Sequence, residues 1–261
     1  MSLRICSLAS GSSGNAYVVM TDSTLLLVDA GLSGKQIKER LLFLGRDAEN
    51  IDGILVTHEH SDHIKGLAVL LKLKRPVFAT RETLASSIKR DYDFANEICP
   101  GQKFCIGDIE INPFKTSHDA ANPIGFSFSK GGKCISIITD TGYVTDDAKR
   151  FIKKSDILVL ESNHDENVLK MGPYPWFLKQ RILSDIGHLS NDAAGEALAQ
   201  IVASENSEKK RTVLLAHLSK ENNFPEMALA TIKNILLEKG CKPNACDIHV
   251  LSRSEVSEIY E

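Results

Sequence analysis

Four potential metal ligands lie within six residues of the sequence, directly after the apolar run Ile54–Val56. They are His58, His60, Asp62 and His63. The apolar run predicts a buried strand, so the ligands are expected in a loop at its end. The first two histidines would point to the same side of an extended chain and could bind one ion, and the last two ligands follow a turn and could bind a second. Imidazole and carboxylate suit zinc, manganese or iron, rather than the all-oxygen shells of calcium or magnesium.

The alternative interpretation of this segment is a solvated turn that is rich in histidine by chance. Three of the eight histidines of the chain lie here, however, which argues against chance. The segment therefore predicts a metal site, and the elements around it must bring further ligands to the same place.

The composition predicts a globular protein without a membrane association. With 261 residues and 43% hydrophobic content, the chain can bury a large core, and we expect one domain over residues 1–261. No segment is apolar enough to span a membrane, and the N-terminus lacks the apolar core of a signal peptide. The six cysteines show no zinc-finger pairing, so we expect free thiols in the cytoplasm. The formal net charge of -3 gives no general attraction for nucleic acid, and the sequence leaves the oligomeric state open.

Short apolar strands alternate with amphipathic helices along the chain. The patterns predict helices after the capping box at Ser33, over 64–73, from Thr80 to about Lys89, after Thr145, and over 175–183, 191–202 and 225–238. Strands are expected over 3–9, 16–20, 25–28, 54–56, 76–79, 109–116, 125–129, 134–139, 157–160, 212–216 and 247–251. Each amphipathic helix needs a sheet face to cover. The sequence therefore predicts an α/β protein, an αββα sandwich of two mixed β-sheets flanked by helices.

The pattern His-x-His-x-Asp-His resembles the signature of the metallo-β-lactamase superfamily, whose fold is such a sandwich. Three further residues follow expected strands in the order of that family: His118, Asp140 and His217. The resemblance implies that one ion is held by His58, His60 and His118. It implies that the second ion is held by Asp62, His63 and His217. Asp140 would bridge the two ions, and Asp29 would support the histidine loop by hydrogen bonds without binding metal.

Two divalent ions with these ligands (zinc or manganese, with iron also possible) would imply hydrolysis. A close pair of dications lowers the pKa of a bridging water and neutralises the charge that forms when the water attacks. The superfamily contains lactamases, thioesterases and nucleases, so the fold alone does not name the substrate.

Two segments of the second half resemble the Glu-Ser-Thr and His-Ser-Thr segments of ribonuclease Z. They are Glu161–Asp165 and Gly187–Asn191. This resemblance implies a catalytic group of Asp62, Glu161 and His188, in which the glutamate–histidine pair assists phosphodiester cleavage. The alternative for His188 is a surface histidine at the start of a helix.

Other residues of these segments are candidates for substrate binding. Ser190 or Asn191 would cap the helix that follows and turn its positive end towards a phosphate. His164 has no counterpart in ribonuclease Z, and it is either an added site residue or a loop histidine. The loop Ser10–Asn15 is either a hairpin connection or a cradle of backbone amides for an anion.

Basic and aromatic residues are interleaved between the two segments. They are Met171, Tyr174, Trp176, Phe177, Lys179 and Arg181. Lys179 and Arg181 could contact the phosphates of a nucleic-acid strand in a groove lined by aromatic rings. The alternative is that the only tryptophan of the chain packs a lid.

The chain as a whole resembles the WalJ/YycJ-type group of bacterial metallo-β-lactamase-fold proteins. Besides the His58 loop and the two ribonuclease Z-like segments, the resemblance is carried by Ser10–Asn15, Tyr174–Trp176 and Ala216–Ser219. It implies a cytoplasmic two-metal phosphodiesterase that acts as an exonuclease on DNA rather than RNA. A phosphodiesterase for a small cyclic or dinucleotide substrate is the second hypothesis, because the net charge does not favour nucleic acid. A metal-binding regulatory protein without turnover is the third.

Overall fold

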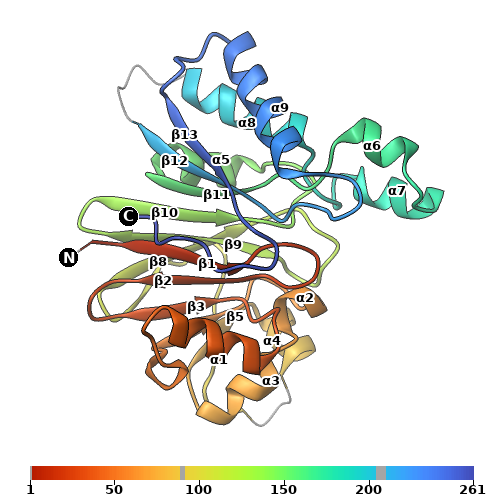
Figure 1. Ribbon diagram of the computed structural model, residues 1–261. Helices are drawn as coiled ribbons and strands as arrows, with labels where there is room; N and C mark the ends of the chain where they lie inside the picture. Colours follow the sequence, from red (N-terminus) through yellow and green to blue (C-terminus); the bar gives the residue numbers. More distant parts are fainter. Residues whose placement is uncertain (1, 89–91, 204–209) are drawn as a thin grey trace.

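Two mixed β-sheets lie face to face and are enclosed by helices on both outer sides (Figure 1). The computed structural model describes residues 2–88, 92–203 and 210–261. The arrangement is the αββα sandwich that the sequence predicts, so the expected fold class is confirmed. Within the described ranges, no helix is both long enough and apolar enough to cross a membrane.

The first sheet, sheet A, contains the strands of the N-terminal part in chain order. They are β1 (Arg4–Ala9), β2 (Ala16–Met20), β3 (Leu25–Val28), β4 (Gly53–Leu55), β5 (Val77–Ala79) and β6 (Ala95–Glu97). The first three pair antiparallel through short turns, whereas β3 to β6 pair in parallel because longer segments with helical turns connect them. These helical segments are α1 (Gly34–Phe43), η1 (Ala48–Asn50), α2 (Ser61–Ile64), α3 (Leu67–Leu70), η2 (Leu71–Leu73) and α4 (Arg81–Ser87).

The second sheet, sheet B, has the order β13-β12-β11-β10-β9-β8-β7. Its strands are β7 (Phe104–Ile106), β8 (Ile109–Lys115), β9 (Ile124–Lys130), β10 (Lys133–Ile138), β11 (Ile157–Glu161), β12 (Arg211–Ala216) and β13 (Cys246–Val250). The strands β10 to β13 are parallel, and β7 to β10 form antiparallel hairpins. The helices of this half are α5 (Asp146–Lys154), α6 (Glu166–Met171), α7 (Trp176–Ile182), α8 (Asn191–Ala203) and α9 (Pro225–Glu238).

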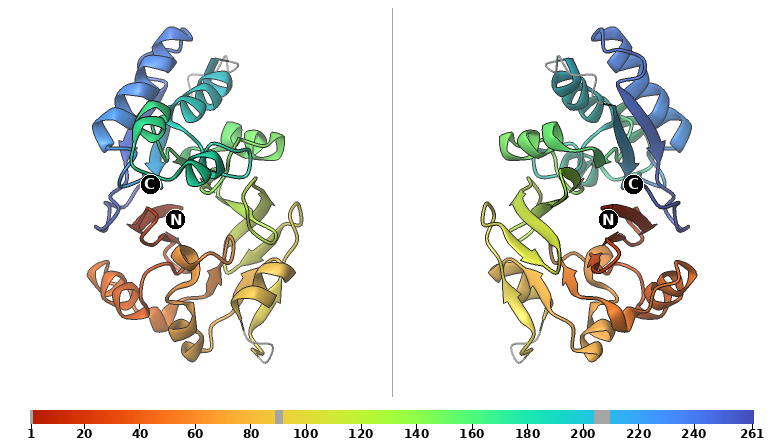
Figure 2. Two further views of the ribbon diagram at one scale, coloured as in Figure 1. Left: turned by 90° about the vertical axis from the view of Figure 1, so that its right-hand side faces the viewer. Right: turned by 90° about the vertical axis from the view of Figure 1, so that its left-hand side faces the viewer.

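Alternation along the strands gives three apolar layers. In β2, Tyr17 and Val19 pack between the two sheets, while Val18 and Met20 pack under the helices that cover sheet A. In sheet B, one outer layer joins the strands to α5, α8 and α9. Figure 2 shows the two sheets between these helical layers from two opposite sides. Both sheets are therefore held rigidly on both faces, and their strand ends make a firm base for a site.

The prediction of one continuous helix over 64–73 is wrong, because α2 ends at Ile64 and helical structure resumes in α3 and η2 only after Gly66. The backbone of this glycine passes so close to another segment that an added Cβ would lie 2.3 Å from the carbonyl oxygen of Leu32. Its amide also donates to the carbonyl of Ala30 at 2.7 Å. The interruption lets the segment after the histidine loop rest directly on the backbone that follows β3. The helix expected from Thr80 ends at Ser87, and Lys89 lies outside the described residues.

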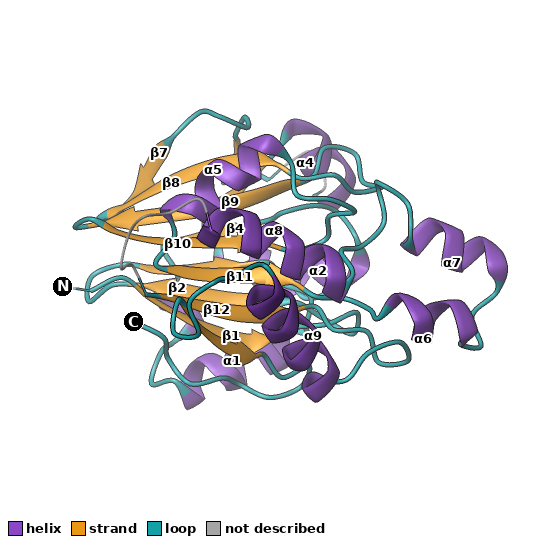
Figure 3. Cartoon of the chain, turned by 90° about the horizontal axis from the view of Figure 1, so that it is seen from above, coloured by secondary structure: helices purple, strands orange, loops and turns teal. Residues whose placement is uncertain are grey.

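A short arm made of α6 and α7 projects from the body of the molecule, as Figures 1 and 3 show. The sequence patterns did not predict α6, which is only six residues long and ends at Met171, before Gly172. Asp165 caps this helix by accepting from the amides of Asn167 and Val168, and an aspartate at that place was its available signal. The arm carries exposed aromatic rings, with Trp176 67% and Phe177 73% exposed.

The C-terminal segment returns to the first strand. Tyr260 and Ile5 exchange backbone hydrogen bonds of 2.8 and 2.9 Å, and the two labelled chain ends lie close together in Figures 1 and 2. This return covers the outer edge of β1, which would otherwise present unpaired backbone groups.

Candidate metal centre

The candidate ligands gather where strands of both sheets end. His58 follows β4, Asp140 follows β10 and His217 follows β12. Asp140 and His217 have a φ of 56° each, and Asp29, after β3, has a φ of 60°. A positive φ is strained for a residue other than glycine, by roughly 1–3 kcal/mol, and it persists where the surrounding structure enforces it. Three residues with a strained backbone at one edge indicate that the positions of their side chains matter more there than local stability.

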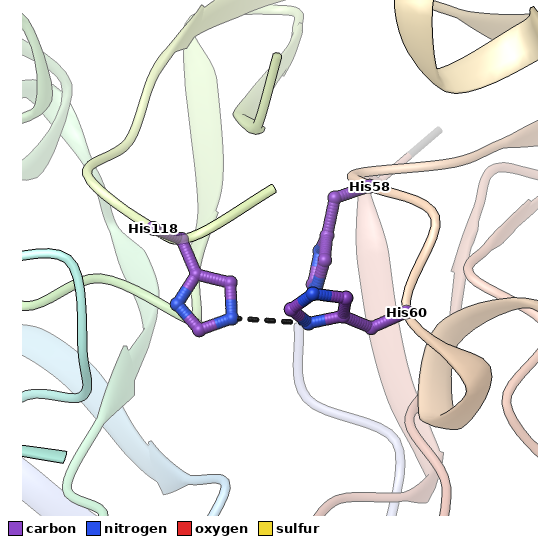
Figure 4. A group of neighbouring side chains, drawn as sticks. All are labelled: His58, His60 and His118. Carbon is purple, nitrogen blue, oxygen red and sulfur yellow. Dashed lines mark hydrogen bonds between the residues drawn. The ribbon is translucent and has the colours of Figure 1, made fainter. Parts of the chain in front are cut away.

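The first ligand group contains His58, His60 and His118, and Figure 4 shows their rings turned towards one another. His118 comes from the sheet opposite to the other two, and its Nε2 lies 3.2 Å from Nδ1 of His60. The ring of His118 is 5.0 Å from each of the other two rings, between centroids. Three imidazoles in this arrangement point nitrogen lone pairs into one small volume, which a cation would stabilise.

The second ligand group contains Asp62, His63, Asp140 and His217. Nε2 of His63 lies 3.1 Å from Oδ2 of Asp140, and Nε2 of His217 lies 3.5 Å from Oδ2 of Asp62. The ligand atoms of this group all lie within 4.8 Å of one another. Two carboxylates and two imidazoles can hold a divalent ion of the zinc or manganese type.

Asp140 lies between the two groups. Its Oδ2 faces His63 in the second group, while its Oδ1 lies 3.8 Å from Nε2 of His118 in the first. The carboxylate is only 3% exposed. One side chain therefore reaches both groups, as the resemblance implies for a bridging ligand.

Several buried atoms at this place lack hydrogen bonds. Nε2 of His58, Oδ2 of Asp140 and Nε2 of His217 are buried and have no hydrogen-bond partner among the described residues. Buried polar atoms without partners are costly, so their convergence fits the binding of metal ions by these residues.

The charges of the site fit the same interpretation. Burial and the neighbouring imidazoles hold the pKa of His58 well below its ordinary value, so its ring is a neutral ligand. Burial also opposes the protonation of His217, but the carboxylates around it outweigh burial and raise its pKa to about 10. The pKa of Asp140 stays well below its usual value despite burial, because the charges of His217 and His63 lower it. A cation entering the second group would thus displace a proton from His217.

Asp29 and Asn15 hold the ring of His63 from opposite sides. Oδ2 of Asp29 accepts from Nδ1 of His63 at 2.8 Å, and its Oδ1 accepts from the amide of Thr57 at 2.9 Å. These are the supporting hydrogen bonds expected of Asp29. Asn15 contacts Nε2 of His63 through Nδ2 at 3.1 Å. Within the loop Ser10–Asn15, the amide of Gly14 donates to the carbonyl of Gly11, and the amide of Gly11 donates to Oδ1 of Asn15.

Glu161 connects the metal centre with His188. Its Oε1 accepts from Nδ1 of His188 and from Nδ1 of His217, each at 2.8 Å. Its Oε2 accepts from the backbone amides of Thr141 and Leu189. Burial alone would raise the pKa of this carboxyl, but the two histidines lower it to about 2. A carboxylate with both oxygens occupied serves to position the two rings, although it also belongs to a group that could hold an ion.

A cavity of about 170 Å³ opens beside these residues. His118, Asp119, Tyr174, Arg181 and His188 are among the residues that line it. Nε of Arg181 donates to Oδ2 of Asp119, so the guanidinium is held next to the ligand His118. Among the predicted substrate-binding residues, Arg181 is thus brought to the site.

The other predicted substrate-binding residues do not line this cavity. Lys179 is 9% exposed, and its Nζ donates to the carbonyls of Lys170 and Gly172, which ties α7 to α6. Asn191 is fully buried, with Oδ1 accepting from the side chains of Ser162 and Asn223.

Ser190 and His164 are also turned inward. Ser190 caps α8 through its Oγ, as one of the two predicted caps, but it is only 5% exposed. His164 is 1% exposed, and neither ring nitrogen has a hydrogen-bond partner among the described residues. Burial lowers the pKa of His164 to about 4, so its ring is neutral.

Two residues of the site were not selected from the sequence. Asn15 belongs to a loop interpreted from the tolerance of glycine and asparagine for a positive φ, and its contact with His63 cannot be predicted from spacing. Asp119 stands next to His118, and its position beside a candidate ligand was the available signal. Both contacts join segments that are distant in sequence, and only the folded sheets bring them together.

The sequence of this chain is similar to those of a known family and of two named relatives. The sequence model of one protein family, the Beta-lactamase superfamily domain, matches residues 24–217. Exodeoxyribonuclease YycJ of Bacillus anthracis is 44% identical over 247 residues, which cover 92% of this chain and 91% of that protein. Exodeoxyribonuclease WalJ of Streptococcus pneumoniae is 43% identical over 240 residues, which cover 88% of this chain and 87% of that protein.

A solved structure agrees on the fold. The metallo-β-lactamase fold protein YhfI from Bacillus subtilis superposes with a TM-score of 0.73, covering 98% of this chain and 99% of that one at 18% sequence identity. The family match covers most of the chain, and the two relatives align with nearly its full length. The chain therefore belongs to the metallo-β-lactamase superfamily, in the group that includes YycJ and WalJ.

Proposed function

We propose that this chain is a phosphodiester hydrolase that depends on two divalent metal ions and degrades DNA as an exonuclease. The observation that carries the proposal is the position of Asp140, which reaches both ligand groups beside a cavity that contains His188. In this assignment, the first ion is held by His58, His60 and His118. The second is held by Asp62, His63 and His217, and Asp140 serves both.

Two bound divalent ions would supply a water of lowered pKa and positive charge for the phosphate oxygens. The residues of the chain then have distinct tasks. Asp29 fixes His63 by accepting from its Nδ1, and the carbonyl of Gly187 fixes His118 by accepting from its Nδ1 at 2.9 Å. Rings that cannot rotate keep their ligand nitrogens aimed at one point, which lowers the cost of binding metal.

His188 is assigned as the proton donor to the departing sugar oxygen. Its Nδ1 donates to Glu161, which leaves Nε2 for the substrate in the cavity. A sugar hydroxyl is a poor leaving group and needs a proton as its bond to phosphorus breaks. Arg181 lines the cavity and is assigned to a phosphate of the substrate. The buried residues Lys179, Ser190, Asn191 and His164 are assigned to the structural support of the site.

DNA is the substrate favoured by the relatives, since both YycJ and WalJ are exodeoxyribonucleases by name. The test is an assay of the zinc- or manganese-loaded protein on end-labelled duplex DNA, single-stranded DNA and RNA of the same sequence. Stepwise shortening of DNA, with RNA degraded at least tenfold more slowly, is the expected result. Internal cuts, or RNA as the better substrate, would contradict the proposal.

A small phosphodiester is the second candidate. Two features favour it. The cavity has a modest volume of about 170 Å³, and Arg181 is paired with Asp119. Neither feature requires the substrate to be a long strand. Cyclic nucleotides and dinucleotides in the same assay decide between the candidates. A small substrate cleaved faster than any DNA strand would make this the function.

We also propose that the chain works in the cytoplasm as one domain over residues 1–261. All six cysteines are free thiols, and Cys99 and Cys105 are exposed, which suits a reducing compartment. Cell fractionation and limited proteolysis test these points, and a secreted protein or two stable fragments would contradict them.

A further inference from the structure

We propose that the cavity beside Phe224 and Arg253 is a second substrate subsite, which holds a nucleotide of the DNA strand next to the one at the metal centre. This subsite extends the nuclease function proposed above and depends on it. Three observations support it: the place of the cavity, an arginine without an ionic partner, and an exposed aromatic ring on a fixed backbone.

The cavity has a volume of about 400 Å³ and lies at the carboxyl ends of β12 and β13. This is the edge of sheet B where His217 also stands, one residue beyond β12. Ser219 lines this cavity and also the cavity that contains His188. The two cavities therefore meet at Ser219, and the proposed strand would pass this residue on its way from one to the other.

Arg253 supplies positive charge to this cavity. Its side chain rests on the loop after β1, where Cγ would be 3.1 Å from a Cβ added to Gly11. No aspartate or glutamate lines the cavity, and the guanidinium has no ion pair or hydrogen bond to the described residues. An arginine without a counter-ion, beside a neutral wall, is suited to a phosphate oxygen.

Phe224 supplies a flat apolar face that is 49% exposed. Its backbone is fixed, because its amide donates to Oδ1 of Asn223 at 3.0 Å and its carbonyl accepts from Ala228 at the start of α9. Asn223 in turn donates to the carbonyl of Ser162 and to Asn191, both fully buried. An exposed phenylalanine alone is common and needs no function. An exposed ring on a fixed backbone, lining the same cavity as an unpaired arginine, is a platform on which a base can stack.

A cavity at the opposite edge of the sandwich provides the comparison. It is about 410 Å³ and contains Arg46 and Arg75, but Asp22, Glu49 and Asp52 line it as well. Its two arginines face three carboxylates, and it lies at the amino ends of β3, β4 and β5. Arg46→Gln therefore removes the same charge as Arg253→Gln from a cavity of similar size far from the metal centre.

The experiment measures binding of fluorescent, phosphorothioate-protected single-stranded DNA of increasing length to the metal-loaded protein at several salt concentrations. For strands long enough to reach both cavities, Arg253→Gln should weaken binding roughly tenfold and lower the slope of log K against log salt by about 0.7, the share of one phosphate contact in a single strand. Phe224→Ala should weaken binding roughly 5- to 150-fold, as for the loss of one stacked base, without a change in the salt slope.

Two further variants keep the result interpretable. Phe224→Leu retains an apolar side chain but removes the ring, and most of the Phe224→Ala loss should remain. Arg46→Gln should bind as the wild type does. Melting temperature and metal content close to wild type show that each variant is folded.

Wild-type affinity for DNA with no loss in Arg253→Gln or Phe224→Ala would overturn the subsite while leaving the nuclease function intact. Equal losses in Arg253→Gln and Arg46→Gln would also overturn it, because only general electrostatic attraction would then remain. A wild-type chain that neither binds nor cleaves DNA would remove the proposed function, and the subsite with it.

Discussion

Two aspartates at opposite ends of the sandwich show how differently one residue type is used. Asp108, in the turn between β7 and β8, accepts from Thr21 and Thr24 of the β2–β3 turn at 2.7 Å each and pairs with Lys130 at 3.1 Å. Asp140, after β10, is buried among imidazoles, and its Oδ2 has no hydrogen bond to the described residues. Asp108 thus joins a turn of one sheet to a turn of the other. Asp140 instead faces buried nitrogen atoms of histidine that have no hydrogen-bond partner among the described residues.

This difference separates stability from function. The pKa of both carboxyls is lowered, for Asp108 by hydroxyl donors and for Asp140 by histidine charges that outweigh burial. At Asp108, the protein supplies every partner, so the carboxylate should stabilise the fold. At Asp140, the partners are ligands of the proposed ions, so the carboxylate should matter chiefly for metal binding and hydrolysis.

Asp140→Ala should have the largest effect. It removes the one side chain that reaches both ligand groups, so the variant should lose close to one metal equivalent and nearly all hydrolysis. Metal analysis and an assay on DNA measure the two losses together. Retention of two equivalents per chain would refute the bridging role.

His188→Ala should slow the cleavage of nucleotide substrates by roughly 10²–10⁴-fold, the range for a lost general acid. Bis(p-nitrophenyl) phosphate has a leaving group that hardly needs a proton, so its hydrolysis should fall much less. The comparison of kcat on the two substrates is the measurement. Equal losses on both would mean that His188 serves binding or metal geometry instead.

Glu161→Gln should give a smaller loss with a mixed character. The carboxylate holds both His188 and His217, so the variant should show the same preference for good leaving groups and also a weaker affinity for metal. Losses of roughly 10- to 100-fold are expected for a residue that orients a ligand. Activity measured against added metal checks this, because part of the loss should recover at high metal concentration. If the loss of activity did not change with metal concentration, Glu161 would act on His188 only and not on metal binding through His217.

Asp108→Asn should have the smallest effect and none on hydrolysis. Loss of the charged acceptor should cost about 1–2 kcal/mol and lower Tm by roughly 2–8 °C. Because its pKa is lower in the folded chain, the stability from Asp108 is present above the unfolded pKa of about 3.9 and is lost as pH falls through the folded value. Thermal unfolding of both proteins should therefore differ at neutral pH and converge in strong acid. A constant difference across pH would contradict this origin.

The sequence predicts those parts of the site that depend on neighbouring residues. His58, His60, Asp62 and His63 are close in sequence, and the strand before them determines where they point. The capping box at Ser33 and the helix over 225–238 were predicted for the same reason, since caps and periodicity are local. His118, Asp140 and His217 came from the resemblance, because nothing near each of them identifies a ligand.

The features that the sequence did not predict depend on packing between distant segments. Lys179 was expected to face a substrate, but the fold of the arm turns it towards two carbonyls. Asn191 was expected at the site, but it belongs to a buried hydrogen-bond network with Ser162 and Asn223. The break at Gly66 depends on the nearby backbone of Leu32, which no local pattern reveals.

The measurement that tests the central claim most directly is a metal titration of the wild-type chain. Protein stripped with a chelator is loaded stepwise with zinc or manganese, and bound metal and hydrolysis of DNA are followed together. The account predicts two equivalents per chain, with most activity appearing as the second is bound, since Asp140 lies between two ligand groups. Saturation at one equivalent with full activity would contradict it.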